Sequence, residues 1–259
     1  MERNFLFITM RSHQLLSLLI GTVLSLLGVS IGLNFVLFNQ AKRYYLEVNQ
    51  TRLDPVGLGY YSTSEKPIFK EQPRIVFFGD SRAENWQAPN LNRYEFINRG
   101  ISAQTSVQTI QRFAQHIHPL QPKVIIVQVG INDLKAIALF PERKTEIIAT
   151  CRSNIEQIVK QSKALGAIVV LTTIFPVGDV PLQRQPFWSD EISKAVKEMN
   201  QHLATLAEDR VIVLDTFSML VDEQGMLRRE YRVDELHLNS QAYSLLNQAL
   251  VKQLETLKL

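Results

Sequence analysis

The sequence predicts an α/β protein built on a parallel β-sheet with helices on both faces, and two observations lead to this class. Short apolar runs that stop at turn residues recur along the chain, which is typical of strands buried on both faces. Amphipathic stretches with helical spacing lie between these runs, and repeated strand–helix units favour a parallel sheet covered on both sides. The predicted strands cover residues 74–78, 94–98, 123–129, 167–174 and 211–214.

A long uncharged segment precedes this pattern. Residues 15–38 are rich in Leu, Val and Ile and contain no charged side chain. As a helix they would extend roughly 36 Å, which is enough to cross a bilayer. The run is longer than a usual signal-peptide core, and no small-residue cleavage site or lipid-modified cysteine follows it. A retained transmembrane anchor is therefore favoured over a cleaved signal or a buried soluble helix.

The charges around this segment do not orient it. Basic residues lie on both sides, with Arg3 and Arg11 before it and Lys42, Arg43 and Arg52 after it. The positive-inside rule therefore favours neither topology. We expect a single-pass N-terminal anchor, with the domain that follows it outside the cytoplasm.

The predicted domain organisation follows from these segments. Residues 1–14 form an N-terminal tail and residues 15–38 form the anchor. Residues 39–72 are predicted to be a linker or arm, because prolines and glycines interrupt them and no sustained period is present. Residues 73–259 form one α/β domain, and a composition of 46% hydrophobic residues is sufficient for its core.

Composition argues against several kinds of site. The net charge is only +3 at pH 7, and Lys and Arg are not clustered with aromatic residues, so no nucleic-acid partner is expected. The single cysteine, Cys151, excludes an intramolecular disulfide and a Cys-based zinc site. It falls on an apolar helical stripe, so we expect a buried thiol rather than a nucleophile. Histidines and carboxylates show no metal-ligand spacing, and no metal or other cofactor is expected.

The helices of the domain are predicted from apolar residues at helical spacing. One stripe precedes the third strand, another precedes the fifth, and the third follows all five strands. Asn239 or Ser240 is the predicted N-cap of that last helix. In order, the stripes contain Val107, Ile110, Phe113, Ala114 and Ile117; Ile192, Val196, Met199, Leu203 and Leu206; and Ala242, Leu245, Leu246, Ala249, Leu250, Leu254 and Leu257.

Four polar segments follow a predicted strand or precede a predicted helix. They are Gly79-Asp80-Ser81, Asn98-Arg99-Gly100, Gly130-Ile131-Asn132-Asp133 and Asp234-Glu235-Leu236-His237. Ligands bind at the carboxyl edge of the strands in open α/β sheets, so we expect the polar groups to meet there. The acid three residues before the histidine can accept from one imidazole nitrogen while the other faces a serine hydroxyl. Taken singly, each segment can also be a turn or a helix cap, and Asp80 and Asp133 are expected to brace loops.

In this order, the four segments together resemble the SGNH hydrolases, also called the GDSL esterase/lipase family, over about residues 73–259. The resemblance implies a three-layer α/β/α sandwich of the flavodoxin-like type, with no metal or cofactor. It implies that Ser81 is the nucleophile, that His237 is the general base and acid, and that Asp234 orients His237. The Ser81 N–H, the Gly100 N–H and the Asn132 side-chain amide would form the oxyanion hole.

Two positions depart from the family pattern. Arg82 stands where many members have leucine, and Ala242 stands where the last helix often has glycine. The first departure puts the name lipase in doubt, because a charged residue follows the nucleophile.

The resemblance implies two-step acyl transfer through Ser81. We expect a membrane-anchored serine ester hydrolase whose substrates are O-acyl groups of envelope glycans or small acyl esters. Two alternatives stay open. The same triad serves an O-acyltransferase, in which a hydroxyl replaces water, and a membrane-anchored binding or assembly protein could keep the fold without turnover.

A long loop is expected to select the substrate. Residues 176–188 join the fourth strand to the next helix, although such a link needs only about two to six residues. Loops at this sheet edge border the site. Phe187 and Trp188 offer flat apolar surface for an acyl group or a sugar face, and Arg184 offers a positive charge for an anionic substrate. Packing of the two aromatic residues on the core is the alternative.

Overall fold

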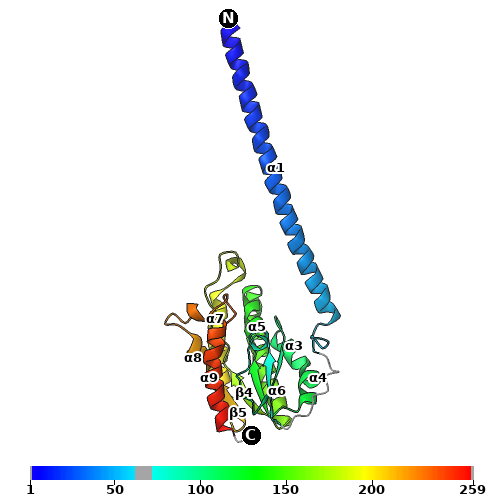
Figure 1. The fold of residues 1–259 in the computed structure, drawn as a ribbon, viewed down its shortest axis with the longest axis vertical. Coiled ribbons are helices and arrows are strands. Elements are labelled where there is room, and N and C mark those ends of the chain that lie inside the picture. Colours follow the sequence, from blue (N-terminus) through cyan, green and yellow to red (C-terminus); the bar gives the residue numbers. More distant parts are fainter. Residues whose placement is uncertain (1, 62–71, 258–259) are drawn as a thin grey trace. The chain divides into compact units, whose positions relative to one another are not determined.

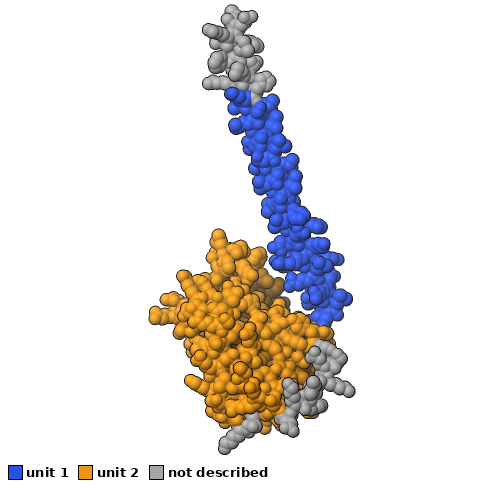
Figure 2. Space-filling view, viewed as in Figure 1, with its two compact units in different colours: residues 1–55 blue, residues 56–259 orange. Residues whose placement is uncertain are grey.

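A computed structural model of the chain describes residues 2–61 and 72–257 (Figure 1). The chain divides into two compact units, Met1–Pro55 and Val56–Leu259, which Figure 2 colours separately. The first unit contains a single helix, and the second contains the β-sheet.

The helix of the first unit, α1 (Glu2–Leu53), is 52 residues long. The large apolar side chains between Leu15 and Phe38 are exposed in this unit. By length and composition, α1 is able to cross a membrane.

The bounds of α1 correct the predicted boundaries at both ends of the anchor. Residues 2–14 of the predicted tail are helical, and the helix continues past Phe38 to Leu53 into the predicted linker. Residues 39–53 contain no glycine or proline, so nothing in their backbone interrupts a helix that has already formed. The first breakers are Pro55 and Gly57.

The end of the predicted linker belongs to the α/β domain. The carbonyl of Val56 accepts from Gln104 Nε2 at 2.6 Å, and the hydroxyl of Tyr61 donates to the Gly100 carbonyl. The hydroxyl of Tyr60 lies 2.5 Å from a carboxylate oxygen of Glu84. Residues 56–61 therefore pack on the domain instead of linking to it. Residues 62–71 of the predicted linker lie outside the described residues.

The second unit is built on a parallel sheet of five strands in the order β2-β1-β3-β4-β5. All five strands predicted from sequence are present, with bounds that differ by at most two residues. In β1 and β3 every residue is buried, as expected for strands covered on both faces. The strands are β1 (Arg74–Gly79), β2 (Glu95–Gly100), β3 (Val124–Gln128), β4 (Ile168–Thr172) and β5 (Val211–Leu214).

Helices cover the sheet on both sides, which gives the predicted three layers (Figure 1). The 107–117 stripe forms two short helices that meet at Arg112, and Asn239 is the N-cap of the last helix. The described α-helices are α2 (Ser81–Glu84), α3 (Ser106–Gln111), α4 (Phe113–Ile117), α5 (Ile131–Lys135), α6 (Lys144–Ala164), α7 (Asp190–Ala204), α8 (Thr216–Leu220) and α9 (Ser240–Thr256). The short 3-10 helices are η1 (His118–Leu120), η2 (Ala136–Ala138), η3 (Pro141–Arg143), η4 (Gln185–Phe187) and η5 (Arg229–Tyr231).

Two apolar cores lie on opposite faces of the sheet. Alternate residues of β1 divide between them, with Val76 and Phe78 in one and Ile75 and Phe77 in the other. The first core is closed by α6 and α7 and includes Cys151, which is fully buried as predicted. The second core is closed mainly by α9. Helices thus cover both faces, and the polar loops lie at the carboxyl edge of the strands.

Candidate active site

Ser81 lies at the carboxyl edge of the sheet, just after the end of strand β1. β1 ends at Gly79, where φ is +152° and a Cβ would lie 1.7 Å from the Gln128 carbonyl oxygen, so only glycine allows β3 to approach. The chain then turns into α2, with Asp80 as its N-cap. The Asp80 carboxylate accepts from Arg82 N at 2.9 Å, which fixes the turn that carries Ser81.

Ser81, His237 and Asp234 form a continuous hydrogen-bonded chain. Ser81 Oγ lies 3.1 Å from His237 Nε2. The other ring nitrogen, Nδ1, lies 2.8 Å from Asp234 Oδ2 and 3.0 Å from Asp234 Oδ1. Ser81 is buried, whereas the side chains of His237 and Asp234 are 34% and 35% exposed. The three residues singled out by the motifs therefore meet, and the imidazole between them is reachable from solvent.

The Asp234 carboxylate is also held by the backbone of its own turn. Oδ1 accepts from Leu236 N and from His237 N, both at 2.8 Å. Burial raises the pKa of Asp234, but the hydrogen bonds from the His237 side chain and from these backbone N–H groups outweigh it and hold the pKa below its ordinary value. An ionised carboxylate accepts from Nδ1–H, which leaves Nε2 as the nitrogen that can accept a proton from Ser81.

Asn132 lies at the same sheet edge, on α5 just after β3. Its Nδ2 donates to the Gln104 carbonyl at 3.0 Å, and its Oδ1 accepts from Lys135 Nζ at 3.1 Å. The next residue, Asp133, accepts from Ser106 N at 2.8 Å and from Ser106 Oγ at 2.6 Å. Asp133 therefore joins α5 to the start of α3, in the bracing role expected from sequence.

Gly100 does not have the free N–H that its predicted role requires. This N–H donates to Asn98 Oδ1 at 2.8 Å. Glycine is needed here for packing, because a Cβ would lie 2.1 Å from Glu84 N in α2. The Asn98 amide also donates to the carbonyls of Ala83 and Glu84. Gly100 thus lets β2 pack closely against α2, and this contact corrects its assignment as an oxyanion donor.

The loop after β2 also contains Ala103, an exposed residue. Ala103 has φ +63°, a left-handed conformation that is uncommon for a residue with a Cβ. Within residues 2–61 and 72–257, no group accepts from its N–H. The adjoining Gln104 carbonyl accepts from Asn132, which brings this part of the loop beside α5. Alanine gives no turn signal in a sequence, so sequence patterns could not identify this position.

Arg82 joins the turn after β1 to two other loops. Its guanidinium is fully buried and donates to the Leu236 carbonyl at 2.9 Å, to the Phe175 carbonyl at 3.0 Å and to the Pro176 carbonyl at 3.2 Å. It also lies over the Phe175 ring, 5.2 Å from the ring centroid. The residue after Ser81 therefore holds the residue before His237. From the sequence alone, Arg82 is only a departure from the family pattern.

The charged residues on either side of Ser81, Asp80 and Arg82, are fully buried. Burial lowers the pKa of Arg82 to about 10 despite the nearby carboxylate of Asp80. Burial likewise raises the pKa of Asp80 to about 6, although Arg82 and its backbone N–H oppose this shift. Asp80 Oδ2 is buried and has no hydrogen-bond partner in the part of the chain that the structure describes.

The segment 176–188 is attached to the turn that carries Asp234 and His237. Gly178 N donates to the Glu235 carbonyl at 2.8 Å, and the Arg184 guanidinium forms an ion pair with the buried Glu235 carboxylate. Asp179 pairs with Arg232 at 2.9 Å. The predicted position of this segment beside the site is therefore observed. Arg184, however, is paired with a carboxylate of the chain itself.

The two aromatic residues of this segment differ in environment. Phe187 is 64% exposed and offers a free ring surface. Trp188 is partly buried and packs against the core between the sheet and α7. Of the two roles that the sequence allowed, Phe187 fits contact with a substrate, because its ring is exposed. Trp188 fits packing on the core.

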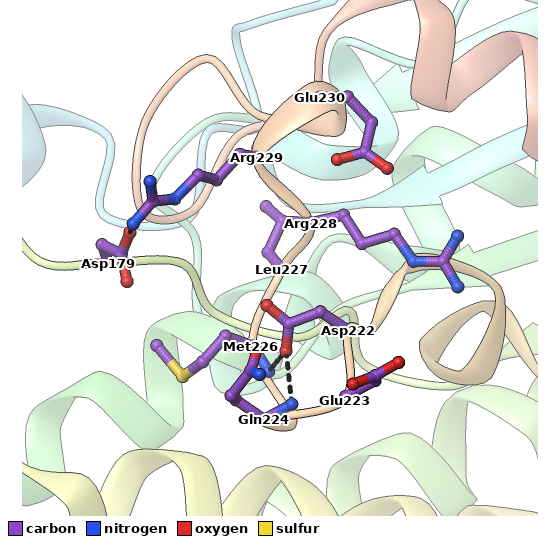
Figure 3. Close-up of a pocket in the computed structure, with 9 residues that line it drawn as sticks. All are labelled: Asp179, Asp222, Glu223, Gln224, Met226, Leu227, Arg228, Arg229 and Glu230. Carbon is purple, nitrogen blue, oxygen red and sulfur yellow. Dashed lines mark hydrogen bonds and ion pairs between the residues drawn. The ribbon is translucent and has the colours of Figure 1, made fainter.

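A separate polar cavity of about 680 Å³ lies beside this segment (Figure 3). Figure 3 shows its nine lining residues, which do not include Ser81, Asn132 or His237. Several of its charged groups are already engaged. Asp222 Oδ1 accepts from Gln224 N and Met226 N, each at 2.9 Å, and Asp179 lies 3.4 Å from Arg229. The cavity is thus distinct from the Ser81–His237 site.

The sequence matches a known family. Residues 66–245 match the model of the GDSL-like Lipase/Acylhydrolase family, a range that includes all four polar segments. No curated protein matches the chain.

Solved structures share the fold. A GDSL-like lipase from Bacteroides thetaiotaomicron VPI-5482 is 23% identical, with a TM-score of 0.61 over 83% of this chain and 97% of that chain. A member of the lipolytic protein G-D-S-L family from Veillonella parvula DSM 2008 is 17% identical, with a TM-score of 0.54 over 71% and 99%. The acetyl xylan esterase AlAXEase is 16% identical, with a TM-score of 0.57 over 70% and 98%.

Proposed function

The chain belongs to the GDSL-like lipase/acylhydrolase family and is an ester hydrolase, and we propose that it is a membrane-anchored serine esterase that acts through an acyl-enzyme on Ser81. In this proposal His237 is the general base and acid, and Asp234 orients its imidazole. The observation that carries the proposal is the unbroken hydrogen-bonded chain from Ser81 Oγ through His237 to Asp234.

The first half-reaction transfers the acyl group to the enzyme. His237 Nε2 takes the Ser81 hydroxyl proton while Oγ forms a bond to the ester carbonyl carbon, and the carbonyl π electrons move to its oxygen. Asp234 stabilises the imidazolium that results. The tetrahedral intermediate then collapses, the bond to the alcohol oxygen breaks, and the Nε2 proton passes to that oxygen. The products are an acyl ester on Ser81 and the free alcohol.

The second half-reaction restores the enzyme. Water takes the place of the alcohol and gives a proton to His237 Nε2 as its oxygen attacks the acyl carbon. Collapse of the second intermediate breaks the bond to Ser81 Oγ, which recovers the proton from Nε2. A carboxylic acid is released, and atoms and charges balance over the cycle.

The negative oxygen formed in both steps needs donors near Ser81. The Ser81 N–H is one, because it opens α2 and no earlier helical turn supplies it with an acceptor. The second N–H of the Asn132 amide is another, because Nδ2 has two hydrogens and one is donated to Gln104. For the third we propose the N–H of Ala103 in place of Gly100, since the Gly100 N–H is donated to Asn98.

The surroundings of Ser81 support a small acyl group on a polar alcohol. Charged side chains lie beside the turns of Asn132 and His237, where Lys135 contacts Asn132 and Arg184 pairs with Glu235. A polar alcohol such as a sugar hydroxyl is better matched to these groups than a lipid chain. Together with an anchor formed by residues 15–38, this supports O-acyl groups of envelope glycans, or small acyl esters, as substrates.

Active-site labelling tests the proposal directly. A fluorophosphonate probe should label the purified full-length protein and should not label Ser81→Ala. Ser218→Ala, at an exposed serine of α8, is the matched control and should label like the wild type. Hydrolysis of a short-chain aryl ester should disappear with Ser81→Ala alone, with the melting temperature almost unchanged. Labelling or wild-type turnover of the alanine variant would show that Ser81 is not the nucleophile.

A further inference from the structure

Lys135 contacts one end of the Asn132 side chain. It is the last residue of α5, three positions after Asn132, so both side chains lie on the same face of that turn. Lys135 Nζ donates to Asn132 Oδ1 at 3.1 Å. Lys135 is half-buried, so its ammonium is held near the site and not in bulk water.

The other end of the Asn132 amide is held by the loop after β2. Nδ2 donates to the Gln104 carbonyl at 3.0 Å. Gln104 is itself buried, and its own side chain is fixed at both ends, by Arg112 Nε at 2.5 Å and by the Val56 carbonyl at 2.6 Å. The acceptor for Asn132 is therefore part of a firmly held loop.

These two contacts together decide which way the amide faces. An ammonium can only donate, and a carbonyl oxygen can only accept. Reversing the Asn132 amide would set a donor against a donor and an acceptor against an acceptor. Only one orientation satisfies both neighbours, and in it the group left free is the second N–H of Nδ2. A free N–H can stabilise a developing oxyanion, whereas a free Oδ1 would repel it.

The charge of Lys135 acts in the same direction. A cation bound to the amide oxygen draws electron density from the nitrogen and strengthens its N–H as a donor. Other charges face Lys135 from neighbouring segments: Asp80 and Arg82 from the turn after β1, Glu235 beside His237, and Arg184 from the segment 176–188.

We propose that Lys135 is a positioning residue that fixes the Asn132 amide with its second N–H toward the oxyanion. The inference rests on the proposed function, because it needs Asn132 to act as an oxyanion donor. It concerns a residue outside the four motif segments, and Lys135 acts on the reaction only through Asn132.

Substitution of Lys135 separates this role from substrate binding. Lys135→Met keeps the length of the side chain and removes the ammonium, and it should lower kcat about tenfold or more with little change in KM, because the lost interaction serves the transition state. Lys135→Arg keeps a cationic donor and should recover most of kcat. Lys194→Met, at an exposed lysine of α7, is the matched control and should behave as wild type.

A double-mutant cycle with Asn132→Ala decides the mechanism. Removing an oxyanion donor costs about a hundred- to a thousandfold in kcat. If Lys135 acts through Asn132, Lys135→Met should change kcat less than about twofold in the Asn132→Ala background. The proposal would be overturned if the losses in kcat of the two single variants multiplied in the double variant. A rise in KM with kcat unchanged in Lys135→Met would also overturn it. Lys135→Gln provides the same comparison if the methionine variant does not fold.

Fluorophosphonate labelling keeps the two proposals apart. Wild-type protein that does not label means that the proposed function has failed. Protein that labels at Ser81 but gives an additive cycle means that only the role of Lys135 has failed.

Discussion

Arg82 Nε donates to the Leu236 carbonyl oxygen at 2.9 Å, so the side chain next to Ser81 holds the backbone next to His237. The distance between nucleophile and base thus depends on a buried cation as well as on the sheet. The same guanidinium holds the carbonyls of Phe175 and Pro176, at the start of the segment that borders the site. One side chain therefore connects three loops at this edge: the turn after β1, the segment that begins near Phe175, and the turn before His237.

We predict that Arg82→Leu lowers both activity and stability. The leucine matches many family members, but here it would leave three buried carbonyls without their donor, at about 1–3 kcal/mol for each unsatisfied group. We expect kcat to fall at least about tenfold and the melting temperature to fall by about 6 °C or more. Arg143→Leu removes an exposed arginine and should change neither. Wild-type activity of Arg82→Leu would show that the loops hold their places without this residue.

We predict that stability falls as the pH rises toward 6, because of Asp80. Burial raises the pKa of Asp80 from 3.8 to about 6, so the folded protein binds this proton more tightly than the unfolded chain. The stability that the proton contributes is complete below about pH 4 and is lost as the pH rises through about 6. A shift of about two pKa units corresponds to about 3 kcal/mol.

The measurement is thermal unfolding from pH 4.5 to 7.5 for the wild type and for Asp80→Asn. The asparagine keeps an oxygen to accept from Arg82 N but does not titrate, so the variant should lose less stability across this range. Identical pH dependence of the two proteins would rule out Asp80 as the source.

We predict that Phe187 affects the choice of acyl group and that Trp188 affects stability. Phe187→Ala should change the ratio of octanoyl to acetyl ester turnover by about three- to tenfold, through lost apolar contact, with little change in melting temperature. Trp188→Ala should instead lower the melting temperature, because its ring packs against the core. Leu182→Ala, at an exposed position of the same segment, is the control. An unchanged ester ranking in Phe187→Ala would remove this segment from substrate selection.

We predict that α1 anchors the protein in a membrane. Extraction with alkaline carbonate should leave the full chain in the membrane fraction. Replacing Leu24 and Leu27 with arginine should release it, because each charge at the centre of a span costs about 2.5–3.5 kcal/mol. Wild-type protein in the supernatant would contradict the anchor. Digestion of the α/β domain by protease added to right-side-out vesicles would support an extracytoplasmic domain, and protection would contradict it.

The sheet could be predicted from sequence because its signal is local. Residues 75–78 of β1 and residues 124–127 of β3 are apolar and buried at every position, and a glycine follows each run within three residues. Ser81 could be predicted at the sheet edge because its motif follows a strand, whereas Asp234 and His237 could be predicted there from the order of the four motifs and the family resemblance. The extent of α1 was missed, because a polar helix without breakers resembles a linker when only its composition is considered.

What sequence could not reveal depends on contacts between distant segments. The residue type of Gly100 does not show whether its N–H faces a substrate or donates to Asn98. An arginine in a sequence is usually expected at the surface, and only the structure shows that Arg82 donates to three carbonyls of other loops. The conformation of Ala103 has no signature in its residue type. In each case the partner is set by tertiary packing, which local patterns do not contain.

The separation of 156 residues between Ser81 and His237 has a consequence for biosynthesis. At ribosomal speeds of about 5–20 residues per second, the proposed nucleophile is made about 8–30 s before its base. The apolar segment 15–38 emerges earlier than both. A nascent chain could therefore engage the membrane while its serine still lacks a proton acceptor, and ester cleavage would begin only after the last turn had docked on the sheet.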